Sequence, residues 1–193
     1  MLRTILAGGL LAVALTAQGA EAILAGGCFW CMEADFEKLD GVSEVVSGYA
    51  GGEIANPSYK QVSSGRTRHV EAVRIHYDAE KISFDDLLAH FWVNVDPTVD
   101  DRQFCDRGRH YRPVIFYTDA QQQAAAEHSR QAVIEAGQVS PIKVTVEPAG
   151  RFWEAETYHQ DYYKKNPVRY TFYRSGCGRD RRLEELWGER VGG

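Results

Sequence analysis

A short apolar segment that turns through two glycines into an amphipathic helix does most to limit how this chain can fold. Residues 22–25 predict a buried strand that ends at Gly26-Gly27. A helix is expected from about Cys28 to Leu39, because apolar side chains recur there at i, i+4 and i+7. These side chains are Met32, Phe36 and Leu39. A strand joined so closely to an amphipathic helix implies a sheet on which the helix packs.

The same succession of strands and helices continues along the chain. Further strands are predicted at residues 42–49, 69–77, 113–117 and 142–146, and further helices at 83–95, 120–136 and 154–164. Residues 96–112 are expected to form a long polar loop, and Pro167, Gly176 and Gly178 interrupt the C-terminal segment. We therefore predict an α+β fold with helices packed on a mixed β-sheet, a ferredoxin-like α/β sandwich, in a single domain with an extended C-terminal tail.

Residues 1–22 have the features of a secretory signal peptide. Arg3 supplies a positive charge, and the apolar run after it is far shorter than the ~20 residues that span a bilayer as a helix. Cleavage after Ala22 would leave residues 23–193 as one domain, and cleavage after Gly19 fits the small-residue pattern equally well. An uncleaved anchor and a buried first helix stay open as alternatives. Export predicts a periplasmic or secreted protein.

Charge and composition bear on the class of partner. The net charge is −5, and no block of basic residues suggests contact with a phosphate backbone, so no nucleic-acid partner is expected. With 44% hydrophobic and 25% charged residues, the chain has the composition of an ordinary globular protein. No stable membrane association is expected either.

Four cysteines indicate redox chemistry, structural disulfides or both. Cys105 and Cys177 fit a structural disulfide as well as any pair does. Cys28 and Cys31 fit it less well, because a bridge between them would close a very small loop. A Cys-x-x-Cys pair is more often redox-active or half of a metal site. A thiol–disulfide oxidoreductase, a zinc module with four cysteine ligands and a binding domain with two structural disulfides therefore stay open as alternatives.

Cys28 occupies a position where a thiol is expected to be reactive. Unpaired N–H groups and the helix dipole at the start of a helix favour anions, so we expect a lowered pKa for the Cys28 thiol. Phe29 and Trp30 beside it would form an aromatic wall for an apolar substrate group, or would be ordinary core residues.

Glu71 is the second candidate for chemistry. By alternation along its strand it shares a face with Ile75 and Tyr77. If that face is buried, desolvation raises the pKa of Glu71 and keeps its carboxyl group protonated as a proton donor. The alternative is a strand edge where Glu71 pairs with Arg68 or Arg74. A thiolate that faces a protonated carboxylic acid suits attack on a polarised S=O or C=O group.

Five separated blocks of the sequence form a recognisable set. They are Gly26-Gly27-Cys28-Phe29-Trp30, Gly48-Tyr49-Ala50-Gly51-Gly52 with Asn56-Pro57-Ser58-Tyr59, His69-Val70-Glu71-Ala72-Val73, Asp106-x-Gly108-x-x-Tyr111-Arg112, and Tyr158-His159-Gln160-Asp161-Tyr162. In this order the set resembles the A-type peptide methionine sulfoxide reductases. The similarity covers roughly Ile23 to Trp187, and several linked motifs are far more specific than any one.

The resemblance implies the reduction of protein-bound methionine S-sulfoxide, with the free sulfoxide as a further candidate substrate, and thereby the repair of oxidised proteins. Residues 23–193 would then be the catalytic domain. The implied reacting groups are Cys28, which attacks the sulfoxide sulfur, and Glu71, which protonates the oxygen, with Tyr59 and Tyr111 as hydrogen-bond donors to that oxygen. The implied substrate-binding residues are Phe29 and Trp30, around the methyl group, and Asp106.

The resemblance also implies how the thiol is regenerated. The Cys28 sulfenic acid condenses with a second cysteine, and a thioredoxin-like protein reduces the resulting disulfide without a metal or other cofactor. We favour Cys177 as this resolving cysteine, because residues 175–178 look flexible, and Cys31 is the alternative. Cys105 is expected to be structural or spare. The resemblance suggests a monomer.

The sequence departs from the family pattern at three positions near these blocks. Arg68 stands where glycine is usual, Val70 stands where alanine is usual, and His110 replaces a common glutamine. None of the three is an expected reacting group. These substitutions therefore bear on substrate preference and not on the reacting groups. A further departure concerns the resolving cysteine, because the C-terminal segment holds one cysteine, Cys177, where some members have two.

Overall fold

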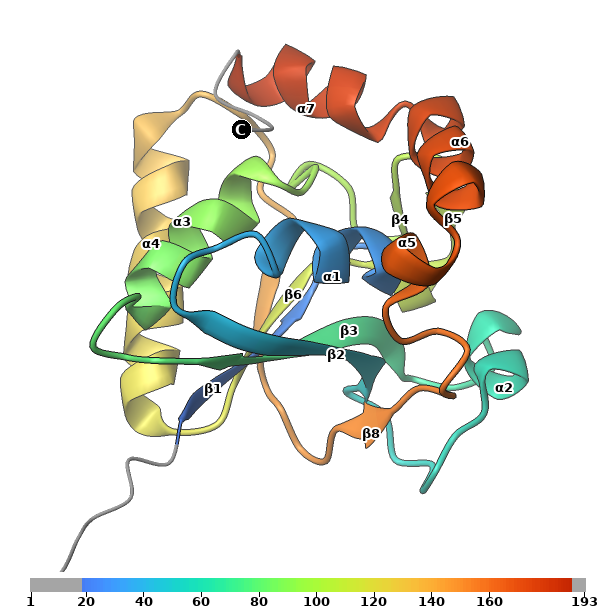
Figure 1. Cartoon of the computed structure of the whole chain (residues 1–193). Coiled ribbons are helices and arrows are strands. Elements are labelled where there is room, and N and C mark those ends of the chain that lie inside the picture. Colours follow the sequence, from blue (N-terminus) through green and yellow to red (C-terminus); the bar gives the residue numbers. More distant parts are fainter. Residues whose placement is uncertain (1–18, 189–193) are drawn as a thin grey trace, which may run out of the picture.

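The computed structural model describes residues 19–188, and Figure 1 shows a central sheet with helices packed around it. Most of the segment expected to be a signal peptide, residues 1–18, lies outside the described part of the chain. No helix among the described residues is both long enough and apolar enough to cross a membrane.

The centre of the molecule is a six-stranded mixed sheet in the order β7-β6-β1-β3-β2-β8. Its strands are β1 (Ala20–Ala25), β2 (Val42–Ala50), β3 (Val70–Tyr77), β6 (Val114–Tyr117), β7 (Thr145–Pro148) and β8 (Trp153–Glu154). β1 pairs antiparallel with β3 and β6, and β2 pairs antiparallel with β3. The order β6-β1-β3-β2 is the ferredoxin-like arrangement that the sequence predicted. β7 makes the sheet mixed, because it runs parallel to β6.

Seven α-helices lie in the described part of the chain. They are α1 (Phe29–Phe36), α2 (Tyr59–Ser63), α3 (Phe84–Val93), α4 (Ala120–Ala136), α5 (Tyr162–Lys165), α6 (Pro167–Cys177) and α7 (Arg179–Trp187). α3 and α4 begin where the side chains of Ser83 and Asp119 accept hydrogen bonds from first-turn N–H groups. The polar loop predicted at 96–112 is ordered by a hairpin of β4 (Arg102–Gln103) and β5 (Asp106–Arg107) and by a 3₁₀ helix, η1 (Arg109–Tyr111).

α1 is buried on nearly all sides. Its inner side packs through Met32 and Phe36 into the core between α1, α3 and the sheet, as the apolar spacing predicted. Its outer side, with Cys31 and Ala34, packs against Tyr170 of α6. In Figure 1, α5, α6 and α7 follow one another around the side of α1 that faces away from the sheet. The C-terminal helices therefore cover the start of α1.

The extended C-terminal tail predicted from the sequence is wrong, because the chain there forms helices α5, α6 and α7. Pro167 occupies the first turn of α6, where a missing N–H costs nothing. Gly178 has a left-handed conformation that ends α6 and leads directly into α7. The predicted helix at 154–164 is reduced to the four-residue α5. Pro167 therefore starts a helix and Gly178 joins two helices, where the sequence suggested that both would prevent helix formation.

The first strand bears on where a signal peptide could end. β1 begins at Ala20, which pairs with Tyr77, and Ala22 within it is fully buried. Cleavage after Ala22 would remove half of this central strand. Cleavage after Gly19 would leave β1 whole.

Candidate active site

Two glycines place Cys28 at the start of α1. A Cβ atom on Gly26 would lie 2.6 Å from the sulfur of Met32, and one on Gly27 would lie 2.5 Å from Cβ of Gln103. Gly27 also has φ +89°, a conformation that favours glycine. The close turn makes Cys28 the N-cap residue of α1, and its carbonyl accepts the backbone N–H of Met32 at 3.3 Å.

Glu71 approaches the same helix start from β3. Its side chain is 2% exposed, and its Oε2 accepts the backbone N–H of Phe29 at 3.1 Å. The strand-edge alternative is therefore wrong, and the buried one describes the structure. Burial raises the pKa of Glu71 to about 8, although the Phe29 amide and Tyr111 favour its ionised form. The carboxyl group of Glu71 is thus protonated near neutral pH and lies against the backbone of Phe29, the residue that follows Cys28.

Burial dominates the acidity of Cys28. It raises the pKa of the Cys28 thiol well above its usual value, and the hydrogen bond to Cys31 and the nearby Glu71 and Asp106 carboxylates add to the effect. The lowered pKa expected from the helix start is therefore wrong. The pKa of Cys31 is lowered instead, because the Cys28 thiol donates to it and because Arg179 and Arg174 lie nearby. The pair is poised as a Cys28 thiol beside a more acidic Cys31.

Two tyrosines, Tyr59 and Tyr111, border Glu71. Tyr59 starts α2, whose first turn is fixed by a capping box between Ser58 and Gln61. Burial, with the Glu71 carboxylate nearby, raises the pKa of Tyr59 to about 12 and raises that of Tyr111 further still. Both phenols therefore keep their protons and can donate hydrogen bonds.

Aromatic rings form the wall beside Cys28. Phe29 is 1% exposed and packs on His159, with ring centroids 4.9 Å apart. The Trp30 ring stacks on Tyr162 at 3.7 Å and meets the edge of Tyr173 at 5.9 Å. Trp30 is therefore the more accessible of the two predicted substrate-binding aromatics.

His159 is a packed residue and not a charged one. Its Nδ1 lies 3.1 Å from the indole Nε1–H of Trp30, which donates to it. Burial lowers the pKa of His159 and so favours the neutral ring. The neutral histidine therefore accepts the indole N–H and holds Trp30 in place.

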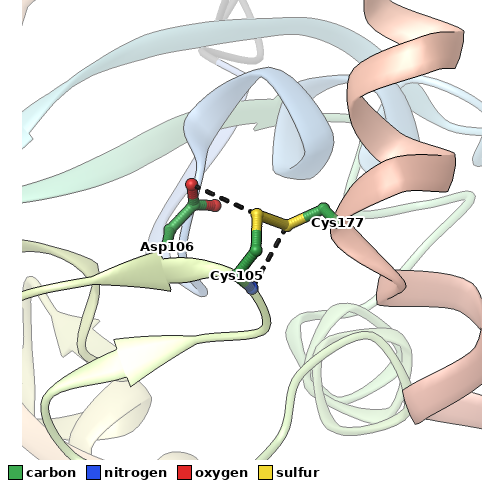
Figure 2. Close-up of side chains that lie close together, drawn as sticks. All are labelled: Cys105, Asp106 and Cys177. Atoms are coloured by element: carbon green, nitrogen blue, oxygen red, sulfur yellow. Dashed lines mark hydrogen bonds between the residues drawn. A yellow bond between two sulfur atoms is a disulfide. The ribbon is translucent and has the colours of Figure 1, made fainter.

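Asp106 links the site to the C-terminal helices. Its carboxylate accepts the hydroxyl of Tyr173 at 2.5 Å, and burial raises its pKa. Its Oδ1 also lies 3.8 Å from Sγ of Cys105 (Figure 2). Asp106 therefore lies between Tyr173 and the neighbouring disulfide, close enough to Cys28 for its carboxylate to raise the pKa of that thiol.

The cysteines form two separate pairs. Cys105 and Cys177 are joined by a disulfide that bridges 72 residues (Figure 2), and Cys28 and Cys31 are free and buried. The four sulfurs thus do not meet in one zinc site. Cys177 is the last residue of α6, so the flexible segment expected around it is wrong. The structure brings Cys31, and not Cys177, next to Cys28.

The sequence did not predict the contacts made by helices α5, α6 and α7, which together form the C-terminal cover of the start of α1. Tyr162 and Tyr173 pack on Trp30, and Arg174 donates to the Asp35 carboxylate at 2.8 and 3.0 Å. Tyr170, Tyr173 and Cys177 recur at helical spacing, which was the signal that could have revealed α6.

Comparison with known proteins gives a consistent result over nearly the whole described chain. The family described as peptide methionine sulfoxide reductase matches residues 20–191. Peptide methionine sulfoxide reductase MsrA 2 of Caulobacter vibrioides is 48% identical, over 93% of this chain and 92% of that protein. The MsrA/MsrB protein of Vibrio cholerae is also 48% identical over 87% of this chain, but the chain spans only 45% of that longer protein.

Solved structures agree with this comparison. Reduced Mxr1 from Saccharomyces cerevisiae has a TM-score of 0.74 at 30% identity, covering 79% of this chain and 88% of that one. Mxr1 in complex with Trx2 shares the fold, with a TM-score of 0.54 at 20% identity over 76% and 86% of the two chains.

Proposed function

The chain belongs to the peptide methionine sulfoxide reductase family, and on this premise we propose that Cys28 is the nucleophile with which it reduces methionine sulfoxide. One observation carries the proposal. Cys28 is the N-cap residue of α1. The buried Glu71 carboxyl group, with a pKa of about 8, accepts a hydrogen bond from the backbone N–H of the next residue, Phe29. A sulfur nucleophile and a proton donor therefore converge at the start of α1.

The first step transfers the sulfoxide oxygen to the enzyme. The sulfur of Cys28 attacks the sulfoxide sulfur and forms a bond to it, while Glu71 protonates the sulfoxide oxygen. The oxygen then passes to the Cys28 sulfur, its bond to the substrate sulfur and the bond between the two sulfurs break, and methionine leaves. Cys28 is then a sulfenic acid, and the proton of its thiol has passed to the Glu71 carboxylate, which is again a carboxylic acid.

The surrounding side chains orient the substrate in this step. Tyr59 and Tyr111 keep their protons and donate hydrogen bonds to the oxygen on which negative charge develops. The methyl group packs against the rings of Phe29 and Trp30. Separate positions for oxygen and methyl allow one epimer at sulfur to be selected, and membership of the family favours the S epimer.

The second step restores the thiols. We propose Cys31 as the resolving cysteine in place of Cys177, because Cys31 contacts Cys28 whereas Cys177 is bonded to Cys105. Cys31 attacks the Cys28 sulfenic acid, water leaves, and a Cys28–Cys31 disulfide forms. A thioredoxin-like dithiol then supplies two electrons. The complex of yeast Mxr1 with Trx2 supports a reductant of this class.

Export is a separate part of the proposal. We propose that residues 1–19 are a signal peptide and that the mature protein is periplasmic or secreted. An intact β1 supports cleavage after Gly19 over cleavage after Ala22. Expression of the full chain in a bacterium and mass measurement of the periplasmic product test this proposal. A mature chain starting at Ala20 is expected, and an uncleaved chain retained with the cell membrane would contradict it.

Steady-state turnover of a peptide sulfoxide tests the reaction. With dithiothreitol as reductant, the wild type is expected to reduce the S epimer, and Cys28→Ser to reduce neither epimer while it stays folded. Exchange of a model protein disulfide without any sulfoxide turnover would instead establish the thiol–disulfide oxidoreductase that the Cys-x-x-Cys pair left open.

A further inference from the structure

A basic hollow of about 680 Å³ lies on the surface beyond the active site. Six of its lining side chains are cationic, namely Arg66, Arg68, Arg109, Arg112, Arg130 and Lys143, against the two carboxylates of Asp100 and Glu147. The chain as a whole has a net charge of −5, so this concentration of positive charge is a local feature. An anion would relieve the repulsion between the cations.

Two of these cations already have partners within the protein. Arg112 donates two hydrogen bonds to the Glu147 carboxylate, at 2.9 and 3.0 Å. Arg130 donates through Nε to the carbonyl of Val144 at 2.9 Å. Within residues 19–188, the other four cations form no ion pair. Four positive charges are therefore free to bind an external group.

Unpartnered polar atoms in the lining residues also point to a missing ligand. The hydroxyl of Thr67 is buried and has no hydrogen-bond partner among the described residues. Nδ1 of His69 is also buried without a partner, but Nε2 of that ring donates to the Ile54 carbonyl, so Nδ1 is left as an acceptor and does not itself favour an anion. Buried polar atoms normally have partners, and these two belong to the segment that carries Arg66 and Arg68. A ligand that brings acceptor oxygens to this segment would accept a hydrogen bond from the Thr67 hydroxyl.

The hollow and the active site are built on the same two segments. Arg68 lies three residues before Glu71, and Arg112 directly follows Tyr111. An extended peptide advances about 3.3 Å per residue. Three residues of chain span at most about 11 Å, so the backbone of Arg68 lies within that distance of Glu71. A substrate whose sulfoxide lies at Cys28, beside Glu71, can therefore bring residues about three or more positions away from the sulfoxide to the cations.

Resting on the proposed function, we propose that this hollow binds acidic side chains of the oxidised protein and so makes the enzyme prefer sulfoxides with nearby Asp or Glu. The cations come from four separate segments around an open hollow, an arrangement that suits several carboxylates in a row better than one small anion. Arg68 is also a position where the chain departs from the family pattern, so the preference is a property of this chain.

Peptide kinetics test the proposal. Three S-sulfoxide peptides, with Asp, Asn or Lys at positions three to six on either side of the sulfoxide, are compared by kcat/KM at about 0.01 M ionic strength, where charges act over roughly 30 Å. The Asp peptide is expected to exceed the Asn peptide by about tenfold, and the Lys peptide to fall below both. Added salt should reduce the difference.

A charge-reversal variant identifies the residues responsible. Arg68→Glu should abolish the preference for the Asp peptide and leave the rate on the Asn peptide unchanged. Lys81→Glu is the matched control, because it changes the net charge equally at an exposed position outside the hollow. It should keep the preference.

The different failures can be told apart. If the wild type reduces all three peptides equally, or if both variants lose the preference equally, the acidic-segment proposal is overturned while the reductase function stands. If no peptide is reduced, the proposed function itself fails. If inorganic phosphate binds the wild type but not Arg68→Glu, and peptide charge has no effect on the rate, the hollow is a small-anion site and the proposal is again overturned.

Discussion

The acidity of Cys28 depends on burial more than on its place at a helix start. A helix of eight residues offers a partial charge at its N-terminus, but the Cys28 side chain is only 6% exposed, and desolvation of a thiolate outweighs that charge. The pKa of Cys31 is lowered instead, because the Cys28 thiol donates a hydrogen bond to it and because Arg179 and Arg174 lie near it. At the residue scale, the chemistry therefore depends on two protons. One lies in the hydrogen bond between Cys28 and Cys31, and the other is on the Glu71 carboxyl group.

Replacement of Glu71 by Gln should remove the proton donor. We expect kcat/KM to fall by about 10²- to 10⁴-fold, the range typical of general acids. In the wild type the acid form is present below a pKa of about 8 and is lost above it, so activity should decline as pH rises through 8. The variant should lack this decline. Glu33→Gln is the control, because Glu33 is also buried, with a pKa raised by burial to about 7, but donates to nothing in the proposed reaction. An alkaline decline that survives in Glu71→Gln would contradict the assignment.

Replacement of Cys31 by Ser should separate the two chemical steps. The first turnover should still release methionine and leave a Cys28 sulfenic acid, which dimedone traps and mass spectrometry detects. Continuous turnover with a thioredoxin-like donor should fall by more than about tenfold, because the disulfide that the donor reduces cannot form. Cys177→Ser should keep turnover. The opposite pattern in the two variants would restore Cys177 as the resolving cysteine.

At the scale of elements, the site depends on a tight turn below it and a helical cover above it. The turn at Gly26 and Gly27 connects β1 to α1 and packs closely against Gln103. The cover places Tyr173 between Asp106 and Trp30. The Cys105–Cys177 disulfide joins the end of α6 to the β4–β5 hairpin. The turn and the cover together bring side chains that are far apart in the sequence close to Cys28.

Substitution of Gly27 by Ala should damage the turn. The new Cβ would lie 2.5 Å from Cβ of Gln103 at a φ of +89°, so Cys28 must shift. We expect the free energy of unfolding to fall by about 1–3 kcal/mol, together with a loss of activity. Gly65→Ala is the matched control, since Gly65 also has a positive φ but no atom within 4 Å of the new Cβ. Equal losses in both variants, by chemical denaturation and by turnover, would show that conformation alone matters.

Removal of the disulfide should loosen the cover. In Cys105→Ser/Cys177→Ser we expect a loss of about 2–4 kcal/mol in the free energy of unfolding, measured with urea. Alkylation of Cys28 should become faster, because α6 covers the cysteine pair. Unchanged stability and alkylation would mean that packing through Tyr170 alone holds α6.

At the scale of the whole molecule, the sequence predicted the features that depend on local pattern. The order of strands and helices and the burial of Met32 and Phe36 followed from apolar periodicity. The C-terminal cover did not, because Pro167 and Gly178 look like breaks until neighbouring helices are seen to start and end on them. The burial of Cys28 depends on that cover, so its pKa could not be predicted either. The basic hollow could not be predicted, since its cations come from segments as distant as Arg66 and Lys143.

A single turnover without reductant tests the central claim most directly. The fully reduced wild type, mixed with an excess of the S epimer of a peptide sulfoxide, should form one methionine per enzyme and lose two thiols, and peptide mapping should find Cys28 joined to Cys31. No methionine, or methionine formed while Cys28 stays a free thiol, would contradict the account.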